Sequence, residues 1–174
     1  MDRDGGINKK PKKHDYAKKW SEFKFLKNAV KSLAILRKKK IKTIIVSNQR
    51  GIKRKLMIIP DLNEIHQKMR AELKKHRAEV TAIYICPHVD EDNCNCRKPK
   101  SGMFFKVAAN LNITLKKSYI IDDAKEGVEA GKKAGCKTIL VLTDNEKRHV
   151  KDIPKWRNKP DYIARNLFST LKII

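Results

Sequence analysis

Two aspartates stand at the start of the chain, in the stretch MDRDGGIN. Asp2 and Asp4 are two residues apart, so in an extended backbone their side chains point to the same side. Two carboxylates on one side can together approach a small charged object, such as a metal ion or a phosphate group. The alternative interpretation is a solvated and disordered start, because chain termini usually fray.

Further polar groups follow apolar runs at three later points in the chain: Ser47-Asn48-Gln49, Cys86-Pro87-His88 and Asp122-Asp123. The cations Arg97 and Lys98 come shortly after the second of these. Acids, a hydroxyl group and a lysine around one point suit phosphoryl transfer assisted by Mg²⁺, which prefers oxygen ligands. An aspartate can also attack phosphorus itself and form an acyl phosphate.

A second group of residues has the composition of a zinc site. Cys86 and His88 are followed, after five residues, by Cys94 and Cys96. Four such ligands in one short loop predict a closed, tetrahedral structural Zn²⁺ site with no open position for water. The alternative is a set of free thiols beside a surface histidine. Cys136 stands apart, and we interpret it as a small buried residue.

The elements that must position these groups follow from hydrophobic patterning. Short β-branched runs predict strands at residues 42–48, 81–86, 117–123 and 137–143. Helical spacing of apolar residues predicts helices within 25–40, from Pro60 to 76, at 102–111, at 126–135 and near 165–171. Alternating strands and helices predict a parallel sheet covered on both faces, and such sheets bind ligands beyond the carboxyl ends of their strands.

Length and charge limit the possibilities further. The 174 residues suit one domain, residues 1–174, with 86–96 as the zinc loop. The net charge of +23 favours phosphate-bearing ligands, nucleic acid or anionic surfaces, but the lysines are scattered, as on ordinary solvated helix faces. We find no apolar run of the ~18 residues that a membrane span needs and no signal peptide, so we expect a cytoplasmic protein without a membrane partner. In that reducing compartment clustered cysteines favour metal over disulfides.

The motifs, taken together and in order, resemble a known family. They are DRDGGIN, IIVSNQRGIKR, CPH followed by CNCRKPKSGM, and YIIDDAKEGVEAGKKAG. The set is similar to the haloacid dehalogenase superfamily, in the branch of D-glycero-D-manno-heptose 1,7-bisphosphate phosphatases and histidinol-phosphate phosphatases. The zinc loop joined directly to Arg97-Lys98-Pro99 is the most specific part. The resemblance implies a three-layer, Rossmann-like α/β fold without a large cap domain.

The resemblance also implies roles for individual residues. Asp2 matches the nucleophile and Asp4 the general acid and base, a role for which its environment must tune its pKa. Asp2, the main-chain carbonyl of Asp4 and Asp123 match the Mg²⁺ ligands. Phosphate and substrate contacts are matched by Ser47, Asn48, Arg54, Arg97 and Lys98.

Some positions depart from the pattern of the family. Its members carry a short apolar strand before the first aspartate, whereas only Met1 precedes Asp2 here. We therefore expect the first central strand to be missing, Asp2 to hang on a free end and the neighbouring strands to lose main-chain partners. Asp122 replaces a usual glycine and Gly127 a usual acid, which is expected to weaken metal binding unless Glu126 compensates. Two other unusual residues, Gly6 and Lys55, lie in loops.

Several hypotheses about function remain open at this point. The first is a monomeric Mg²⁺-dependent phosphatase of carbohydrate metabolism that acts on a small sugar phosphate, D-glycero-D-manno-heptose 1,7-bisphosphate before histidinol phosphate. The second, suggested by the charge, is a nucleic-acid 3′-phosphatase; nucleic acid is not the favoured partner. The third is an inactive, truncated relative that keeps zinc and binds polyanions.

Overall fold

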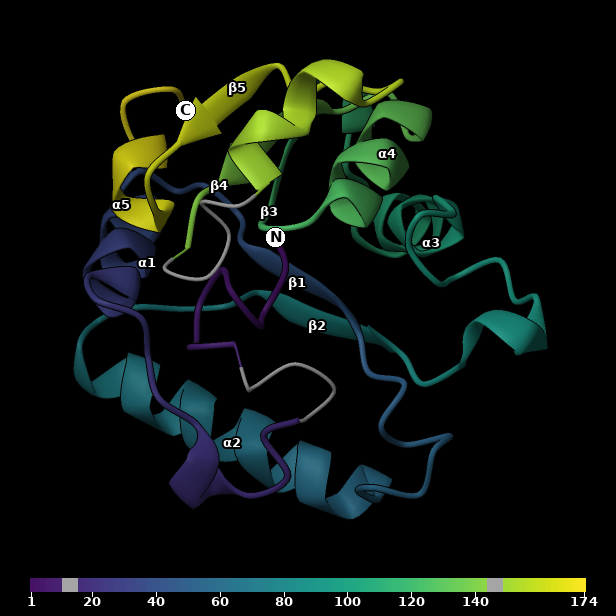
Figure 1. Cartoon of the computed structure of the whole chain (residues 1–174). Helices are drawn as coiled ribbons and strands as arrows, with labels where there is room; N and C mark the ends of the chain where they lie inside the picture. Colours follow the sequence, from purple (N-terminus) through teal and green to yellow (C-terminus); the bar gives the residue numbers. More distant parts are fainter. Residues whose placement is uncertain (11–15, 144–148) are drawn as a thin grey trace.

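The computed structural model describes residues 1–10, 16–143 and 149–174, and it contains parallel strands in two groups. In the first group β1 (Ile44–Asn48) pairs with β2 (Ala82–Cys86). In the second, β4 (Lys137–Val141) lies between β3 (Tyr119–Asp122) and β5 (Tyr162–Ala164) (Figure 1). Four strands were predicted. The fifth, β5, was missed because its three residues are too few to form a recognisable pattern.

The first residues of the chain join the two groups of strands. The α-amino group of Met1 donates to the Ile44 carbonyl at 2.7 Å, and the Met1 carbonyl accepts from Val46 N at 2.9 Å. On the other side Asp2 N donates to the Ile121 carbonyl at 2.9 Å. Met1 and Asp2 therefore connect β1 to β3, where Figure 1 places the N-terminus.

Among the described residues no strand precedes β1, and Met1 and Asp2 make main-chain hydrogen bonds between β1 and β3. The expected loose attachment of Asp2 is wrong, because main-chain bonds on both sides hold Met1 and Asp2. An apolar cavity of about 370 Å³ remains between β1 and β3, lined by residues that include Met1, Ile44 and Tyr119.

In the described part of the chain five α-helices pack around these strands, and their predicted positions are largely confirmed. They are α1 (Ala29–Lys38), α2 (Ile59–Lys75), α3 (Gly102–Leu111), α4 (Lys125–Lys133) and α5 (Leu167–Thr170). Single 3-10 turns lie at Trp20–Glu22, Asp90–Asp92, Leu115–Lys117, His149–Lys151 and Ile153–Lys155. The part of the chain that the structure describes contains no large cap domain.

Alternation along the strands divides the core into two layers, one on each sheet face. Ile45 and Ile121 pack in one apolar cluster with residues of α1, α2 and α5. Val46 and Ile120, one position away, pack in a second cluster with residues of α3 and α4. Helices therefore cover both faces, as predicted, and Figure 1 shows α2 and α3 on opposite sides of β1 and β2.

The predicted core residues are confirmed as well. The apolar stripes of α1 and α2 are buried throughout, at Ala29, Leu33, Leu36, Leu62, Ile65, Met69 and Leu73. Cys136 is buried in the second cluster. The lysine-rich segment 8–19 is expected from its sequence to be a flexible surface loop. Its residues 11–15 lie outside the described residues, so this expectation stays a prediction.

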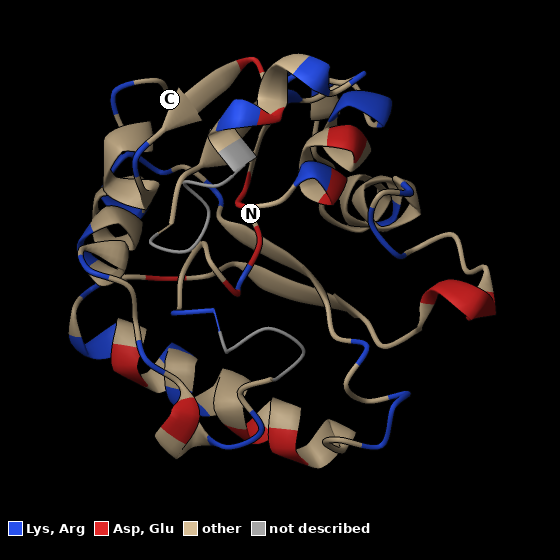
Figure 2. Cartoon of the chain, viewed as in Figure 1, with Lys and Arg blue, Asp and Glu red and all other residues tan. Residues whose placement is uncertain are grey.

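Basic and acidic residues are distributed differently in the molecule. Lys and Arg are distributed around the ribbon, while acidic residues also occupy the interior near the N-terminus and the end of β3 (Figure 2). Among the described helices none combines the length and apolarity needed to cross a lipid bilayer.

Candidate active site

Three carboxylates converge where Met1 and Asp2 pass between β1 and β3. One oxygen from each of Asp2, Asp122 and Asp123 lies within 4.8 Å of the others. Asp122 ends β3 and Asp123 follows it, so the carboxyl end of this strand brings both acids to the start of the chain. Gly5 makes this approach possible: its φ is +88°, and a Cβ there would overlap the Asp123 carboxylate.

Lys98 lies between two of these acids. Its Nζ donates to Asp2 Oδ1 at 3.0 Å and to Asp122 Oδ2 at 2.6 Å. The side chain is only 5% exposed. Burial opposes the charge, but the Asp122 and Asp2 carboxylates outweigh it and raise the pKa of Lys98. Lys98 is therefore a fixed ammonium group directly beside Asp2.

Asp4 has a different environment from Asp2. Its carboxylate accepts from Arg3 Nη2 at 3.0 Å, from Asn8 Nδ2 at 2.8 Å and from Gln49 Nε2 at 2.8 Å. Burial alone would raise the pKa of Asp4, but the Arg3 guanidinium and these hydrogen bonds together lower it. At Asp2 burial also raises the pKa, and the nearby Lys98 does not outweigh it, so the pKa of Asp2 is raised.

The residues at the end of β1 connect to both aspartates. Gln49 Nε2 also donates to Ser47 Oγ at 3.1 Å, so Ser47 and Asp4 share one amide. Asn48 holds the main chain of Lys98: its Nδ2 donates to the Lys98 carbonyl, and its Oδ1 accepts from Lys98 N, both at 3.1 Å. The site therefore brings together Ser47, Lys98 and the two aspartates. Asn48 lies beside them, but both of its side-chain amide atoms are used to hold the main chain of Lys98.

Asp123 carries a further cation contact. Lys10 Nζ donates to Asp123 Oδ2 at 2.9 Å. Burial, opposed by Lys10 and reinforced by the Asp122 and Asp2 carboxylates, raises the pKa of Asp123 to about 7. A divalent cation among these oxygens would relieve both the burial of charge and the repulsion, and carboxylate oxygens are ligands that Mg²⁺ prefers. The donor set therefore fits Mg²⁺.

The cysteine loop fits a tetrahedral zinc ion. The Sγ atoms of Cys86, Cys94 and Cys96 are 3.3–3.7 Å apart, and Nδ1 of His88 lies 3.6 and 3.4 Å from Cys86 and Cys96. A Zn–S distance of about 2.3 Å in a tetrahedron places two sulfurs about 3.8 Å apart. The four predicted ligands therefore lie at nearly the required spacing, at the carboxyl end of β2.

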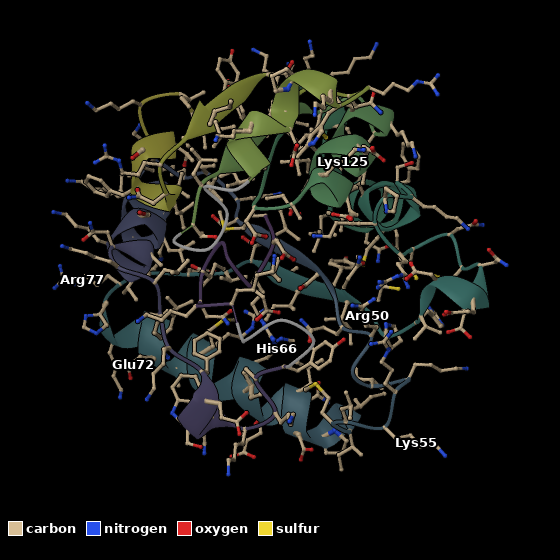
Figure 3. The ribbon with its side chains drawn as sticks, in the orientation of Figure 1. Arg50, Lys55, His66, Glu72, Arg77 and Lys125 are labelled. Carbon is tan, nitrogen blue, oxygen red and sulfur yellow. The ribbon has the colours of Figure 1, made fainter. Side chains whose placement is uncertain are left out.

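Of the two predicted arginines, Arg97 follows the cysteine loop directly, and Arg54 lies in the segment between β1 and α2. Arg97 donates to both carboxylate oxygens of Asp90, at 2.7 and 3.4 Å. Arg50, labelled in Figure 3, is 3.8 Å from Asp90, and the exposed Arg54 also acts on it electrostatically. Hydrogen bonding from Arg97, with the charges of Arg50 and Arg54, lowers the pKa of Asp90. These arginines thus gather at the zinc loop and not at Asp2.

Two residues of this site were not singled out from the sequence. Arg3 is 1% exposed, and besides Asp4 it contacts Nε2 of His66 at 3.1 Å; Figure 3 labels His66 on α2. Lys10 lies in a lysine-rich stretch in which no pattern distinguishes it. For Arg3 the sequence did contain one indication, because it is a single cation between the two candidate catalytic acids.

Known proteins are similar to this chain over most of its length. The family model Hydrolase_like (HAD-hyrolase-like) matches residues 95–170. D-glycero-beta-D-manno-heptose-1,7-bisphosphate 7-phosphatase of Neisseria meningitidis is 33% identical over 148 residues, which cover 85% of this chain and 78% of that protein. The protein of the same name from Bordetella bronchiseptica is 32% identical and covers 85% of this chain and 82% of its own.

A solved structure extends the similarity to the whole fold. The crystal structure of D,D-heptose 1,7-bisphosphate phosphatase from B. bronchiseptica, complexed with magnesium and phosphate, matches with a TM-score of 0.90 at 28% identity. The match covers 99% of this chain and 94% of that one. With the sequence relatives, this likeness confirms the resemblance expected from the motifs. The chain therefore belongs to the D-glycero-D-manno-heptose 1,7-bisphosphate phosphatase family of the haloacid dehalogenase superfamily.

Proposed function

We propose that residues 1–174 form one phosphatase domain that removes a phosphate from D-glycero-D-manno-heptose 1,7-bisphosphate through a phospho-aspartate on Asp2. The observation that carries the proposal is the meeting of Asp2, Lys98 and Asp123 at the carboxyl end of β3. The relatives named as heptose-bisphosphate 7-phosphatases support the choice of substrate.

In the first step an oxygen of the Asp2 carboxylate bonds to phosphorus, and the bond from phosphorus to the substrate oxygen breaks. Asp4 gives a proton to the departing alcohol. The low pKa of Asp4 keeps it ionised before substrate binds, but a phosphate beside it is a like charge and raises that pKa. A bound phosphate therefore favours the protonated form of Asp4 that this step requires.

In the second step water attacks the phosphorus of the phospho-aspartate, Asp4 accepts the proton of the water, and inorganic phosphate leaves. Ser47 Oγ and Lys98 Nζ hold the phosphoryl oxygens in both steps, because fixed charges and donors supply much of the catalysis in phosphoryl transfer. Mg²⁺ held by Asp2, Asp123 and the Asp4 carbonyl would supply further positive charge at the phosphate. The cofactor that we propose for the cysteine loop is a structural Zn²⁺, bound by Cys86, His88, Cys94 and Cys96.

The direct test is release of phosphate by the full chain, with Mg²⁺ present, from three substrates in parallel. These are the heptose bisphosphate, histidinol phosphate and a 3′-phosphorylated oligonucleotide. We expect the highest kcat/KM on the heptose bisphosphate and loss of turnover when Mg²⁺ is removed. A higher kcat/KM on either of the other substrates would replace the proposed substrate, and a folded protein that hydrolyses none would overturn the function.

The role of Asp2 is tested by Asp2→Asn, which keeps the shape of the side chain and removes its nucleophilic charge. We expect turnover to fall to the background rate. Asp152→Asn is the matched control, since Asp152 is exposed and lies outside the site. Residual phospho-enzyme formation in Asp2→Asn, detected with acid-quenched labelled substrate, would assign the nucleophile to another residue.

A further inference from the structure

Asp122 is a buried acid that the steps above do not use. The residue is 2% exposed, and both of its carboxylate oxygens are engaged. Oδ2 accepts from Lys98 Nζ at 2.6 Å, and Oδ1 accepts from the main-chain N of Ala124 at 3.0 Å. The side chain is therefore held at both oxygens, with one of them directed at the lysine beside Asp2.

Gly127 lies against this carboxylate from the first turns of α4. A Cβ placed on Gly127 would overlap Cγ and Oδ2 of Asp122. The backbone of Gly127 is helical, so this position does not need glycine for its conformation. Glycine within a helix costs about 0.5–1 kcal/mol relative to alanine, which calls for another reason for its presence. The reason that the geometry gives is space for Asp122.

We propose that Asp122 is the positioning residue for Lys98, and that Gly127 is present because the Asp122 carboxylate occupies the space that a side chain from α4 would fill. The inference rests on the proposed function. Both positions depart from the usual pattern of the family, in which the strand end carries glycine and the helix carries the acid. Here the two departures compensate, because the carboxylate comes from β3 and the glycine from α4.

The chemistry explains why Lys98 needs a second carboxylate. Asp2 loses its negative charge when its oxygen bonds to phosphorus, so the contact between Asp2 and Lys98 changes during each turnover. Asp122 forms no bond to phosphorus in either step. A buried ammonium group requires a partner at every stage, and Asp122 provides the partner that the reaction does not consume.

The first experiment measures kcat and KM for Asp122→Asn on the substrate that the wild type hydrolyses. Asparagine keeps the acceptor for Ala124 N and removes the charge that faces Lys98. We expect kcat to fall about 10²-fold, because displacing a reacting group by about 1 Å has effects of that size, while KM changes little. If the wild type is active and Asp122→Asn has the same kcat, the positioning role is overturned and the proposed function stands. A wild type without activity overturns the proposed function itself.

The second experiment moves the carboxylate to α4. Asp122→Gly alone is expected to lose activity, and the exchange Asp122→Gly with Gly127→Asp is expected to recover at least a tenth of wild-type kcat. The matched control is Asp122→Gly with Gly127→Asn, which restores volume without charge and should remain inactive. Equal activity of the two double variants would show that only packing matters and would overturn the inference.

The third experiment tests the shared space by thermal unfolding and does not depend on activity. Gly127→Ala should lower the Tm in the wild-type background, where the new methyl group meets Asp122. In the Asp122→Gly background the same substitution should leave the Tm unchanged or raise it, because the space is free and alanine favours the helix. An equal fall of Tm in both backgrounds would contradict the proposed reason for Gly127.

Discussion

At the scale of single residues, the site shifts the pKa values of two neighbouring aspartates in opposite directions. Asp2 is buried beside other carboxylates, which raises its pKa, whereas Asp4 is bound by Arg3 and two amides, which lowers its pKa. The difference arises from residue 3, because the Arg3 side chain turns to Asp4 and not to Asp2. The proposed nucleophile and the proposed acid–base group, two positions apart, are thereby distinguished by their partners.

Arg3 has a consequence for the acid stability of the protein through His66. A guanidinium group only donates, so Nε2 of His66 accepts and the ring is neutral. Burial, followed by the charge of Arg3, lowers the pKa of His66 to about 4 from an unperturbed 6.5. Between these pH values the unfolded chain binds a proton that the folded chain does not. The free energy of unfolding therefore falls as the pH drops from 6.5 to 4, by up to about 3 kcal/mol.

We predict that His66→Gln reduces this acid-induced loss of stability. The measurement is urea unfolding at several pH values between 7.5 and 4.5, comparing the change in unfolding free energy for wild type and variant. His76→Gln is the control, because His76 is 57% exposed and contacts only the surface acid Glu72 among the ion pairs of the described residues. Parallel curves for wild type and His66→Gln would refute the assignment.

At the scale of elements, the zinc loop and the gap between β1 and β3 are the parts that the sheet does not stabilise by itself. In the loop the turn Asp90–Asp92 contains no buried residue, so we expect the order of this loop to depend on the four proposed zinc ligands and on the ion pair of Arg97 with Asp90. In the gap, Met1 and Asp2 connect β1 to β3 by main-chain hydrogen bonds. Each feature leads to a prediction about stability.

For the loop, we predict that removing zinc with a strong chelator lowers the Tm and that adding Zn²⁺ restores it, because metal-binding energy contributes to folding. Cys96→Ser should lower the Tm of the untreated protein and abolish the response to chelator. Cys136→Ser is the control, since that buried thiol lies outside the loop and the response should persist. One zinc per chain is expected by metal analysis, and a chain without zinc whose Tm ignores the chelator would contradict the site.

For the gap, we predict that about five apolar β-branched residues added before Met1 raise the unfolding free energy by about 2 kcal/mol per buried side chain. Such residues would enter the apolar cavity of about 370 Å³ between β1 and β3. They would also turn the buried α-amino group, whose pKa burial lowers to about 6, into an uncharged amide. An extension of equal length in Gly and Ser is the control, and equal stability of the two proteins would show that the cavity does not accept a strand.

At the scale of the whole molecule, the net charge of +23 is the property that most favours the alternative hypothesis of nucleic-acid binding. The distribution in Figure 2 places Lys and Arg around the ribbon, while the converging groups at the sheet edge are mainly carboxylates. A distributed positive field attracts any polyanion, and such binding depends strongly on salt.

We therefore predict that an oligonucleotide binds only non-specifically. Its affinity, measured by fluorescence anisotropy, should fall by about 10³-fold or more between 50 and 200 mM salt. Hydrolysis of the heptose bisphosphate should change much less over the same range, because its site is built from buried groups. Saturable binding that persists at 200 mM salt would support the nucleic-acid hypothesis instead.

The sequence by itself determined what depends on local pattern and spacing. The alternation of strands and helices, the buried stripes of α1 and α2, and the quartet of cysteines and histidine lie within short windows, where periodicity and ligand spacing can be read directly. The motifs further identified the family, because each lies within a short window and they follow one another in the order that the family has. The predicted roles of Asp2, Asp4, Ser47 and Lys98 came from that match and stay predictions until tested.

Tertiary structure decided what depends on residues distant in the chain. Lys98 meets Asp2 across 96 positions and Lys10 meets Asp123 across 113. Lys98 was singled out only by its position after the cysteine loop, and nothing local to Lys10 distinguishes it from the other lysines. The attachment of Met1 to β1 and Asp2 to β3, and the overlap of space between Asp122 and Gly127, likewise depend on neighbours placed by the fold. The hydrophobic pattern of the sequence indicates which side of a helix or strand is buried. Which side chains then contact one another is determined only by the packing of the helices and strands in the folded protein.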